Sequence, residues 1–214
     1  MKLYVYDHCP FCVKARAIFG LTATPFKLVV MLNDDEATPT RMIGKKMAPI
    51  LEHDERFIPE SMDIVAHVDR LAGGKVLAGP RSPQVADWVG MSADALYPLA
   101  MPRWAASPLA EFATPEARAY FTRNKEAIIG SFTDRMAQSG AYIAALNRHL
   151  LALGELIRSP DAVNGELSED DIHLFAALRA MSIVRTIVYP PAVEAYRIRM
   201  AERTGIDLHD AIAL

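Results

Sequence analysis

The chain has 214 residues, of which 51% are hydrophobic and 23% are charged, and its formal net charge is −3 at pH 7. This composition excludes an intrinsically disordered chain, and the small negative charge offers no basic surface for nucleic acid or anionic lipid. The sequence has neither a signal-peptide pattern nor an apolar run long enough to span a membrane. We therefore expect a soluble, cytoplasmic protein that binds neither nucleic acid nor membranes.

The first seventy residues alternate between strand-like and helix-like patterns. Short aliphatic runs predict strands, and apolar residues spaced three or four apart predict helices. The expected elements are a strand at 3–6, a helix at 10–19, a strand at 26–31, a helix at 38–43, strands at 50–51 and 56–58, and a helix at 61–71. Gly20 and Gly44 are placed to stop the first two helices, and 26–31 has the pattern of the most clearly buried strand. This β-α-β-α-β-β-α order predicts a small mixed sheet covered by helices.

Beyond residue 72 the strand patterns stop. Residues 73–83 hold three glycines and two prolines, which is the composition of a linker. We expect one domain at 1–72 and an all-helical domain at 84–214. Its helices are predicted near 84–96, 115–138, 142–157, 168–186 and 191–203, with Pro98, Pro102 and Pro108 interrupting the chain between the first two. One helix start is explicit, because Ser168 and Asp171 form a carboxylate variant of the capping box.

The two cysteines, Cys9 and Cys12, are the most informative residues. A disulfide between them closes almost no loop, so it contributes little to stability. Cys9 is expected at a helix start, where unpaired amides and the helix dipole favour its thiolate, and Pro10 suits the first helical position. Cys12 lies one turn further on the same face, within disulfide range. The spacing predicts a redox pair with an exposed attacking thiol and a sheltered resolving thiol.

Half a zinc site and two incidental thiols are the other interpretations of this pair. A zinc site needs four ligands, and the chain has no further cysteine and no histidines at ligand spacing, so we expect no metal. A Cys-x-x-Cys pair near a β-α-β unit favours redox use. His8 adjoins Cys9 and could act as a base, but we expect a loop histidine that faces solvent.

Four segments carry a family resemblance. They are Cys-Pro-Phe-Cys at 9–12, Ala-Pro-Ile-Leu at 48–51, Pro-Glu-Ser-Met-Asp-Ile at 59–64 and Asn-Gly-Glu-Leu-Ser-Glu-Asp-Asp at 164–171. In this order and spacing the chain resembles the bacterial glutaredoxin 2 family, the larger glutaredoxins built like glutathione transferases, over essentially its whole length. The resemblance implies a thioredoxin-like first domain, an all-helical second domain and glutathione as co-substrate, with no other cofactor. Phe11 departs from the family, which more often has tyrosine there.

The resemblance also assigns roles to single residues. It implies that Cys9 is the nucleophile and Cys12 the resolving thiol. It places a cis peptide bond before Pro49, where the backbone of Ala48 pairs with the cysteine of glutathione. Without the cysteine pair, a strand-edge proline would be the preferred interpretation of Pro49.

Glu60 and Ser61 match the positions that hold the γ-glutamyl end of glutathione. Physical chemistry agrees, because a helix N-terminus binds carboxylates and Glu60 can neutralise an ammonium. A plain N-cap is the other interpretation of Ser61. Lys45 and Lys46 either meet the glycyl carboxylate or are solvated, and we leave both out of the predicted set. The expected glutathione-binding residues are Cys9, Pro10, Phe11, Ala48, Pro49, Glu60 and Ser61.

Together these features predict a monomeric, glutathione-dependent oxidoreductase that reduces protein disulfides and glutathione mixed disulfides. The Cys9 thiolate attacks the substrate sulfur, and Cys12 or a glutathione molecule resolves the mixed disulfide. A glutathione transferase that conjugates electrophiles is one alternative, although transferases usually have a serine, a tyrosine or a single cysteine at this place. A non-catalytic module whose thiols register redox state is the other.

Overall fold

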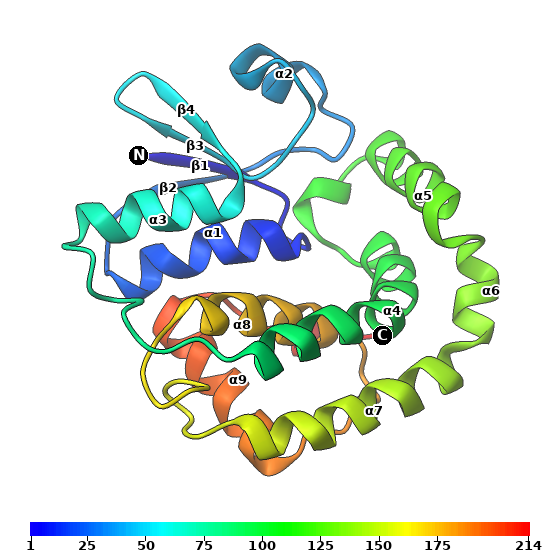
Figure 1. Cartoon of the computed structure of the whole chain (residues 1–214). Coiled ribbons are helices and arrows are strands. Elements are labelled where there is room, and N and C mark those ends of the chain that lie inside the picture. The colour runs from blue at the N-terminus through cyan, green and yellow to red at the C-terminus, as the bar shows by residue number, and fades with distance from the viewer.

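The first domain is built on a four-stranded sheet with the strand order β2-β1-β3-β4. A computed structural model describes all 214 residues. The elements of this domain are β1 (Lys2–Val5), α1 (Pro10–Leu21), β2 (Lys27–Val30), α2 (Ala37–Ile43), β3 (Ile50–His53), β4 (Arg56–Pro59) and α3 (Ser61–Leu71). Strand β1 is parallel to β2 and antiparallel to β3, and β3 is antiparallel to β4. Helices α1 and α3 lie side by side on one face of the sheet (Figure 1), which is the thioredoxin-like arrangement that the element order predicts.

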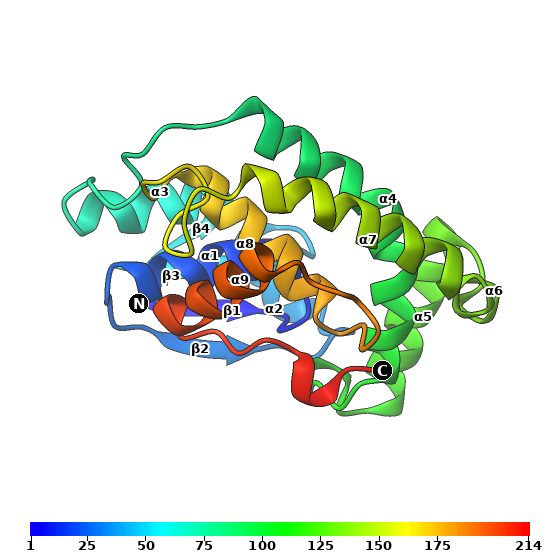
Figure 2. The same cartoon turned by 90° about the horizontal axis from the view of Figure 1, so that it is seen from below.

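The second domain contains only helices. They are α4 (Pro83–Ala106), the 3-10 turn η1 (Ala110–Phe112), α5 (Pro115–Ile129), α6 (Phe132–Ala137), α7 (Ser139–Leu156), α8 (Glu169–Met181), α9 (Pro191–Thr204) and the 3-10 turn η2 (Asp210–Ile212). Helix α8 is buried along most of its length and packs against α1, α4 and α9 (Figure 2). None of the helices combines the length and the apolar character that crossing a bilayer requires.

One hydrophobic core spans both domains. Leu3, Ile18 and Val68 of the first domain belong to the same buried cluster as Phe175 and Tyr196 of the second. Because α1 contacts α3 on one side and α8 and α9 on the other, it is the helix through which this core is continuous. The position of the first residues of α1 is therefore fixed by both domains.

Helix α4 overturns the expected interruption at the prolines. Pro98 and Pro102 both lie inside this helix, which continues to Ala106. Proline removes a backbone hydrogen bond and bends a helix, and the packing of the surrounding turns compensates for the loss. Leu99, Ala100 and Trp104 are all buried on these turns. Figure 1 shows α4 changing direction along its length instead of ending.

Two expectations about the first domain are also wrong. Helix α1 does not stop at Gly20 but runs to Leu21, and a Cβ at position 20 would lie 2.0 Å from the carbonyl oxygen of Thr204. The glycine therefore allows α1 and the end of α9 to approach closely. Strand β2 is not the most buried strand, because it forms one edge of the sheet, and Lys27 and Leu28 are exposed.

The remaining differences concern helix ends. The helix expected at 115–138 divides at Gly130, whose φ of 84° is not helical, and Ser131 caps the next helix by accepting from the amide of Asp134. Helix α8 ends at Met181 rather than near residue 186. At this end the Ser182 hydroxyl donates to the carbonyl of Arg179. The capping box at the start of α8 is confirmed, with the Ser168 amide donating to the Asp171 carboxylate at 2.9 Å.

Candidate active site

The strand register brings the predicted site residues to one end of the sheet. Tyr4 near the end of β1 lies opposite Ile50 at the start of β3, and Ile50 lies opposite Pro59 at the end of β4. The segments that follow β1, precede β3 and follow β4 therefore meet at the same edge. Cys9, the Ala48–Pro49 peptide and the Glu60–Ser61 pair lie on these three segments.

The two thiols occupy different environments at the start of α1. Cys9 is the N-cap residue, with Pro10 in the first helical position, and it is half-buried. Cys12 is fully buried, and its Sγ accepts a hydrogen bond from the Tyr6 amide at 3.4 Å. Both cysteines are free thiols. The sequence therefore anticipates both the cap position of Cys9 and the shelter of Cys12.

These environments move the two pKa values in opposite directions. A hydrogen bond from the Cys12 thiol lowers the pKa of Cys9 against the opposing effect of burial, and the charge of His8 and nearby amides lower it further. Burial raises the pKa of Cys12 well above its ordinary value, and its interaction with Cys9 adds to the increase. At neutral pH the arrangement favours a Cys9 thiolate next to a protonated Cys12.

The peptide bond between Ala48 and Pro49 is cis, as the family resemblance implies. Glu60, not Ser61, is the N-cap residue of α3, and Ser61 is the buried first residue of the helix. No side chain caps this end of α3, so its amides are free of a side-chain acceptor. The Glu60 carboxylate is exposed, and its Oε1 lies 3.9 Å from Lys45 Nζ. The geometry thus presents free amides and a carboxylate at the same edge.

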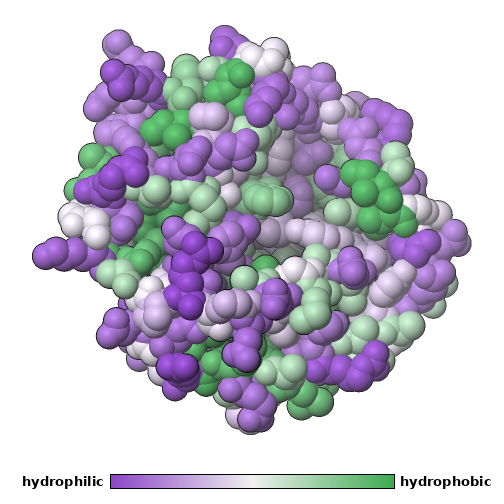
Figure 3. All heavy atoms as spheres, in the orientation of Figure 1, coloured by the Kyte–Doolittle hydropathy of each residue, from purple (hydrophilic) through white to green (hydrophobic).

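A cleft of about 320 Å³ opens between the two domains beside Cys9. Figure 3 shows this face of the molecule hollowed at the boundary between the domains. The lining residues of the first domain are Tyr6, His8, Cys9, Asn33, Lys46, Met47 and Ala48, and those of α5 are Tyr120, Phe121, Asn124 and Lys125. Of the predicted residues, only Cys9 and Ala48 line this cleft. Pro10 and Phe11 line a smaller depression against α4 and α8, where the half-exposed Phe11 ring lies 4.8 Å from Lys14 Nζ.

Sequence reasoning missed the α5 wall of the cleft. Nothing in the local pattern of α5 distinguishes these residues from those of any exposed helix. Lys46, which is not in the predicted set, also lines the cleft: its ammonium lies 3.5 Å from the centre of the Tyr120 ring and donates to the carbonyl of Asn33. The Tyr120 hydroxyl donates to Glu36 Oε1 at 2.5 Å, so contacts join the domains across the mouth of the cleft.

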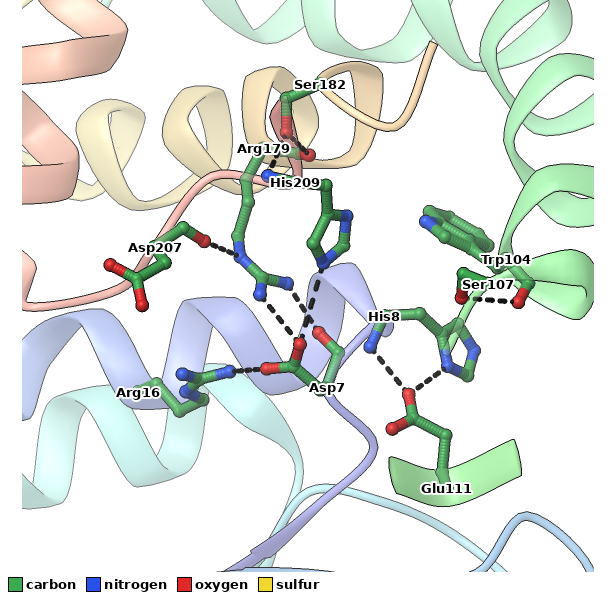
Figure 4. Close-up of polar contacts among 10 residues, drawn as sticks. All are labelled: Asp7, His8, Arg16, Trp104, Ser107, Glu111, Arg179, Ser182, Asp207 and His209. Atoms are coloured by element: carbon green, nitrogen blue, oxygen red, sulfur yellow. Dashed lines mark hydrogen bonds and ion pairs between the residues drawn. The ribbon is translucent and has the colours of Figure 1, made fainter. Parts of the chain in front are cut away.

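Asp7 lies at the centre of a charged cluster between the domains (Figure 4). Its Oδ2 lies 2.9 Å from Arg179 Nη2 and 3.6 Å from His209 Nε2, and its Oδ1 pairs with Arg16. Burial raises the pKa of Asp7, but its contacts with His209, Arg179 and Arg16 outweigh burial and hold it well below its usual range. This cluster, which we call the Asp7 cluster, attaches the loop before Cys9 to α8 and to the segment before η2.

His8 overturns the expectation of a solvent-facing loop residue. Only 6% of it is exposed, because rings of the helical domain surround it. Its backbone N–H and its Nδ1 both lie 2.8 Å from Oε1 of Glu111, a fully buried residue of η1 (Figure 4). The sequence gives no sign of this contact because Glu111 lies 103 positions further along the chain. Nowhere in the structure do His, Cys, Asp and Glu side chains form a group of three that could hold a metal ion.

The fold and the paired thiols define a thioredoxin-fold protein with a glutathione transferase-like, two-domain architecture. Residues 3–76 match the family model for the glutathione S-transferase N-terminal domain, and residues 84–213 match that for the glutaredoxin 2 C-terminal domain. The chain therefore belongs to the glutaredoxin 2 family.

Individual relatives agree with this assignment. Glutaredoxin 2 of Escherichia coli K12 is 50% identical to the chain, and the match covers 100% of both proteins. The structure of glutaredoxin 2 from Salmonella typhimurium, solved in complex with glutathione, superimposes with a TM-score of 0.97 at 52% identity over 100% of this chain and 98% of that one. A glutathione S-transferase of Ceriporiopsis subvermispora shares the fold alone, with a TM-score of 0.65 at 14% identity over 95% and 94% of the two chains.

Proposed function

We propose that this protein is a glutathione-dependent thiol–disulfide oxidoreductase that reduces glutathione mixed disulfides and protein disulfides. The observation that carries the proposal is the pair of free thiols at the start of α1, of which the half-exposed one has the lowered pKa and the buried one the raised pKa. A low pKa makes a thiol both an attacking thiolate and a good leaving group at neutral pH. The family membership and the glutathione complex of the Salmonella relative support the same activity.

In the proposed mechanism, Cys9 is the nucleophile and Cys12 the resolving thiol. The Cys9 thiolate bonds to one sulfur of the substrate disulfide, and the other sulfur leaves as a thiolate. The resulting mixed disulfide is resolved in one of two ways. Cys12 attacks it from inside and releases a reduced protein, or a glutathione molecule attacks it from the cleft. Glutathione is a co-substrate in this scheme, and no metal or organic cofactor is needed.

Glutathione is proposed to lie along the edge where the three segments meet. Its cysteine pairs with the backbone of Ala48 beside Pro49, while Pro10 and Phe11 border the entrance to Cys9. Its γ-glutamyl carboxylate is bound by the free amides at the start of α3, with Ser61 beside them, and Glu60 neutralises its ammonium. The uncapped α3 and the exposed Glu60 carboxylate support this orientation.

Three further expectations accompany this function. The domain limits are proposed at 1–72 and 84–214, and residues 72–82, between α3 and α4, form neither helix nor strand. The proposed location is the cytoplasm, where thiols are kept reduced. The proposed oligomeric state is a monomer, which light scattering combined with gel filtration tests directly.

Turnover separates this function from the transferase activity and from a non-catalytic module. The purified protein is assayed with glutathione and a glutathionylated peptide, and in parallel with glutathione and an aromatic electrophile. An oxidoreductase reduces the mixed disulfide and conjugates the electrophile poorly. Faster conjugation than reduction would favour a transferase, and the absence of both reactions would favour a redox-registering module.

A further inference from the structure

His8 has one ring nitrogen occupied and the other available. The backbone N–H of His8 donates to Oε1 of Glu111, and we assign the proton of the neutral ring to Nδ1, which then donates to the same oxygen. Nε2 is the remaining nitrogen of the ring, and His8 lines the same cleft as Cys9. A histidine whose one nitrogen is held by a carboxylate and whose other nitrogen is free has the geometry of a proton carrier.

Three aromatic rings and one buried carboxylate surround the ring of His8. The ring centroids of Trp104, Phe112 and Phe121 lie 5.1, 5.2 and 5.0 Å from that of His8. Aromatic faces and a buried carboxylate both attract an imidazolium. The titratable groups around it are Tyr6 at the end of β1, Cys9 at the start of α1, Glu111 in η1, Lys125 on α5 and His209 before η2. Only Glu111 makes a hydrogen bond with the ring.

We propose that His8 carries the proton in the exchange reaction of Cys9, with Glu111 of the helical domain as its positioning residue. This inference rests on the function proposed above. Nε2 takes the proton of the Cys9 thiol and leaves a thiolate beside an imidazolium. The Cys9 sulfur then bonds to the glutathione sulfur of a mixed disulfide R–S–S–G. The S–S bond breaks with its electron pair on RS⁻, and the imidazolium gives its proton to RS⁻, which leaves as RSH.

The proposal gives the helical domain a part in the chemistry. His8 and Cys9 come from the first domain, whereas the carboxylate that orients His8 comes from η1 between α4 and α5. The amide of Asn33 also donates to the carbonyl of Glu111 at 2.9 Å, so the backbone and the side chain of this residue are both fixed against the first domain. The second oxygen of Glu111 is buried and has no partner, so the His8 contact is the only side-chain interaction of this carboxylate.

The test uses two variants and a matched control in the full-length protein, all on a Cys12→Ser background so that Cys9 is the only thiol. Glu111→Gln keeps the size and an acceptor oxygen but removes the charge. His8→Gln keeps an N–H for Glu111 but cannot carry a proton, and it decides the question if Glu111→Gln does not fold. Asp7→Asn removes a neighbouring charge from the same domain boundary and serves as the control.

The first measurement is the rate of Cys9 alkylation by iodoacetamide as a function of pH, with folding checked by circular dichroism. Loss of a nearby positive charge raises the pKa of a thiol by about one unit or more, so both variants should shift the alkylation profile upward by about one pH unit and show about a tenfold lower rate at pH 5. Asp7→Asn should keep the profile of its parent. An unchanged profile in a folded variant, or an equal shift in the control, would overturn the proposal in favour of a structural contact.

The second measurement tests the return of the proton. Glutathione mixed disulfides are compared that release either an alkyl thiol or an aromatic thiol of low pKa. An aromatic thiolate leaves without needing a proton, whereas an alkyl thiolate benefits from one. His8→Gln should therefore lose about tenfold more activity with the alkyl leaving group than with the aromatic one. Equal losses with both would remove His8 from the proton transfer.

Failure of the inference and failure of the proposed function give different results. Alkylation measures Cys9 ionisation without any glutathione or enzymatic turnover. A parent protein that does not reduce mixed disulfides would refute the function, whatever the alkylation profiles show. Normal turnover together with identical alkylation profiles in His8→Gln and its parent would refute the inference alone.

Discussion

Asp7 and His8 are neighbours on one loop, and each contacts a charged residue of the helical domain, yet the two contacts are built differently. Asp7 uses both carboxylate oxygens, and its carbonyl accepts from Arg179 as well. His8 uses one ring nitrogen for Glu111, its other ring nitrogen makes no hydrogen bond, and the residue lines the cleft. A fully paired group fixes the loop, whereas a half-paired group beside a nucleophile remains able to exchange a proton.

Asp7 and His8 therefore divide two roles between neighbouring positions: the contacts of Asp7 stabilise the fold, and the cleft beside His8 holds the reactive thiol. Changes on the buried side, around Asp7, should lower the free energy of unfolding and leave the chemistry of Cys9 intact. Changes on the cleft side, around Cys9, should alter turnover and leave the fold intact. Removing one partner of a buried ion pair is costly because the other charge is left without compensation.

The largest effect is expected from the thiols on the cleft side. Cys9→Ser should abolish the reduction of both glutathione mixed disulfides and protein disulfides, because Cys12 is buried and its pKa is raised. Cys12→Ser should keep the removal of glutathione from mixed disulfides, which needs only Cys9 and an external thiol, and should lose much of its activity on protein disulfides. Steady-state turnover with both substrate types measures this. An active Cys9→Ser enzyme would refute the assignment of the nucleophile.

The next effect is expected on the buried side. Arg179→Met should lower the free energy of unfolding by about 3 kcal/mol, since Asp7 would lose its most buried partner. Urea unfolding at neutral pH measures the change. Turnover per folded molecule should stay at the level of the unmodified protein. A double-mutant cycle of Arg179→Met with Asp7→Asn should show a coupling energy, because both changes break the same ion pair, and strictly additive losses would show that Arg179 acts through something other than Asp7.

Acid should act on the same cluster more gradually. Burial lowers the pKa of His209, so below about pH 6.5 the unfolded chain binds a proton that the folded chain resists, and stability falls. The pKa of Asp7 is also held low, so the stability it contributes is fully present above about pH 4 and is lost as the pH falls further. Urea unfolding between pH 7 and pH 3 should show both losses. Asp7→Asn should remove only the loss of stability below about pH 4. If that loss were unchanged in the variant, its assignment to Asp7 would be wrong.

Much of the first domain could be predicted from local patterns. The strands, α3 and the cap position of Cys9 depend on residues within a few positions of one another, and α3 runs over the expected Ser61–Leu71. The course of α4 through Pro98 and Pro102 and the edge position of β2 could not be predicted in the same way. Both depend on what packs against the element, which the pattern of the element itself does not contain.

In the candidate site too, features set by local sequence could be predicted and features set by distant packing partners could not. Its two thiols follow from a four-residue motif, and the cis bond before Pro49 follows from the family resemblance. The burial of His8 was predicted wrongly because its partner Glu111 and the three rings around it all come from the other domain. Contacts between domains leave no periodic signal in a single sequence.

A smaller effect is expected at the glutathione-binding edge. Glu60→Gln and Ser61→Ala should each raise the Michaelis constant for glutathione by about ten- to a hundred-fold, because each removes a contact to a charged ligand end. The free energy of unfolding should be unaffected in both variants. Glu55→Gln, on the exposed turn between β3 and β4, is the matched control and should change neither quantity. Unchanged saturation in both variants would return Glu60 and Ser61 to purely structural roles.

The smallest effect is expected at Phe11. The ring is 52% exposed, so the hydroxyl added by Phe11→Tyr can be hydrated. The free energy of unfolding should stay within about 0.5 kcal/mol and turnover within about twofold of the unmodified protein. Differential scanning calorimetry and the mixed-disulfide assay measure the two quantities. A tenfold change in turnover would show that a hydroxyl at this position takes part in the reaction.

The spacing of the residues that surround the nucleophile has a consequence during protein synthesis. Cys9 leaves the ribosome early, but Glu111 follows its partner His8 by 103 positions and Arg179 follows Asp7 by 172. At elongation rates of about 5–20 residues per second, the nascent chain carries Cys9 for roughly ten seconds or more before Arg179 is made. Throughout that interval the loop before Cys9 lacks the ion pairs that attach it to the helical domain, so the loop reaches its full stability only after the last helices have been made.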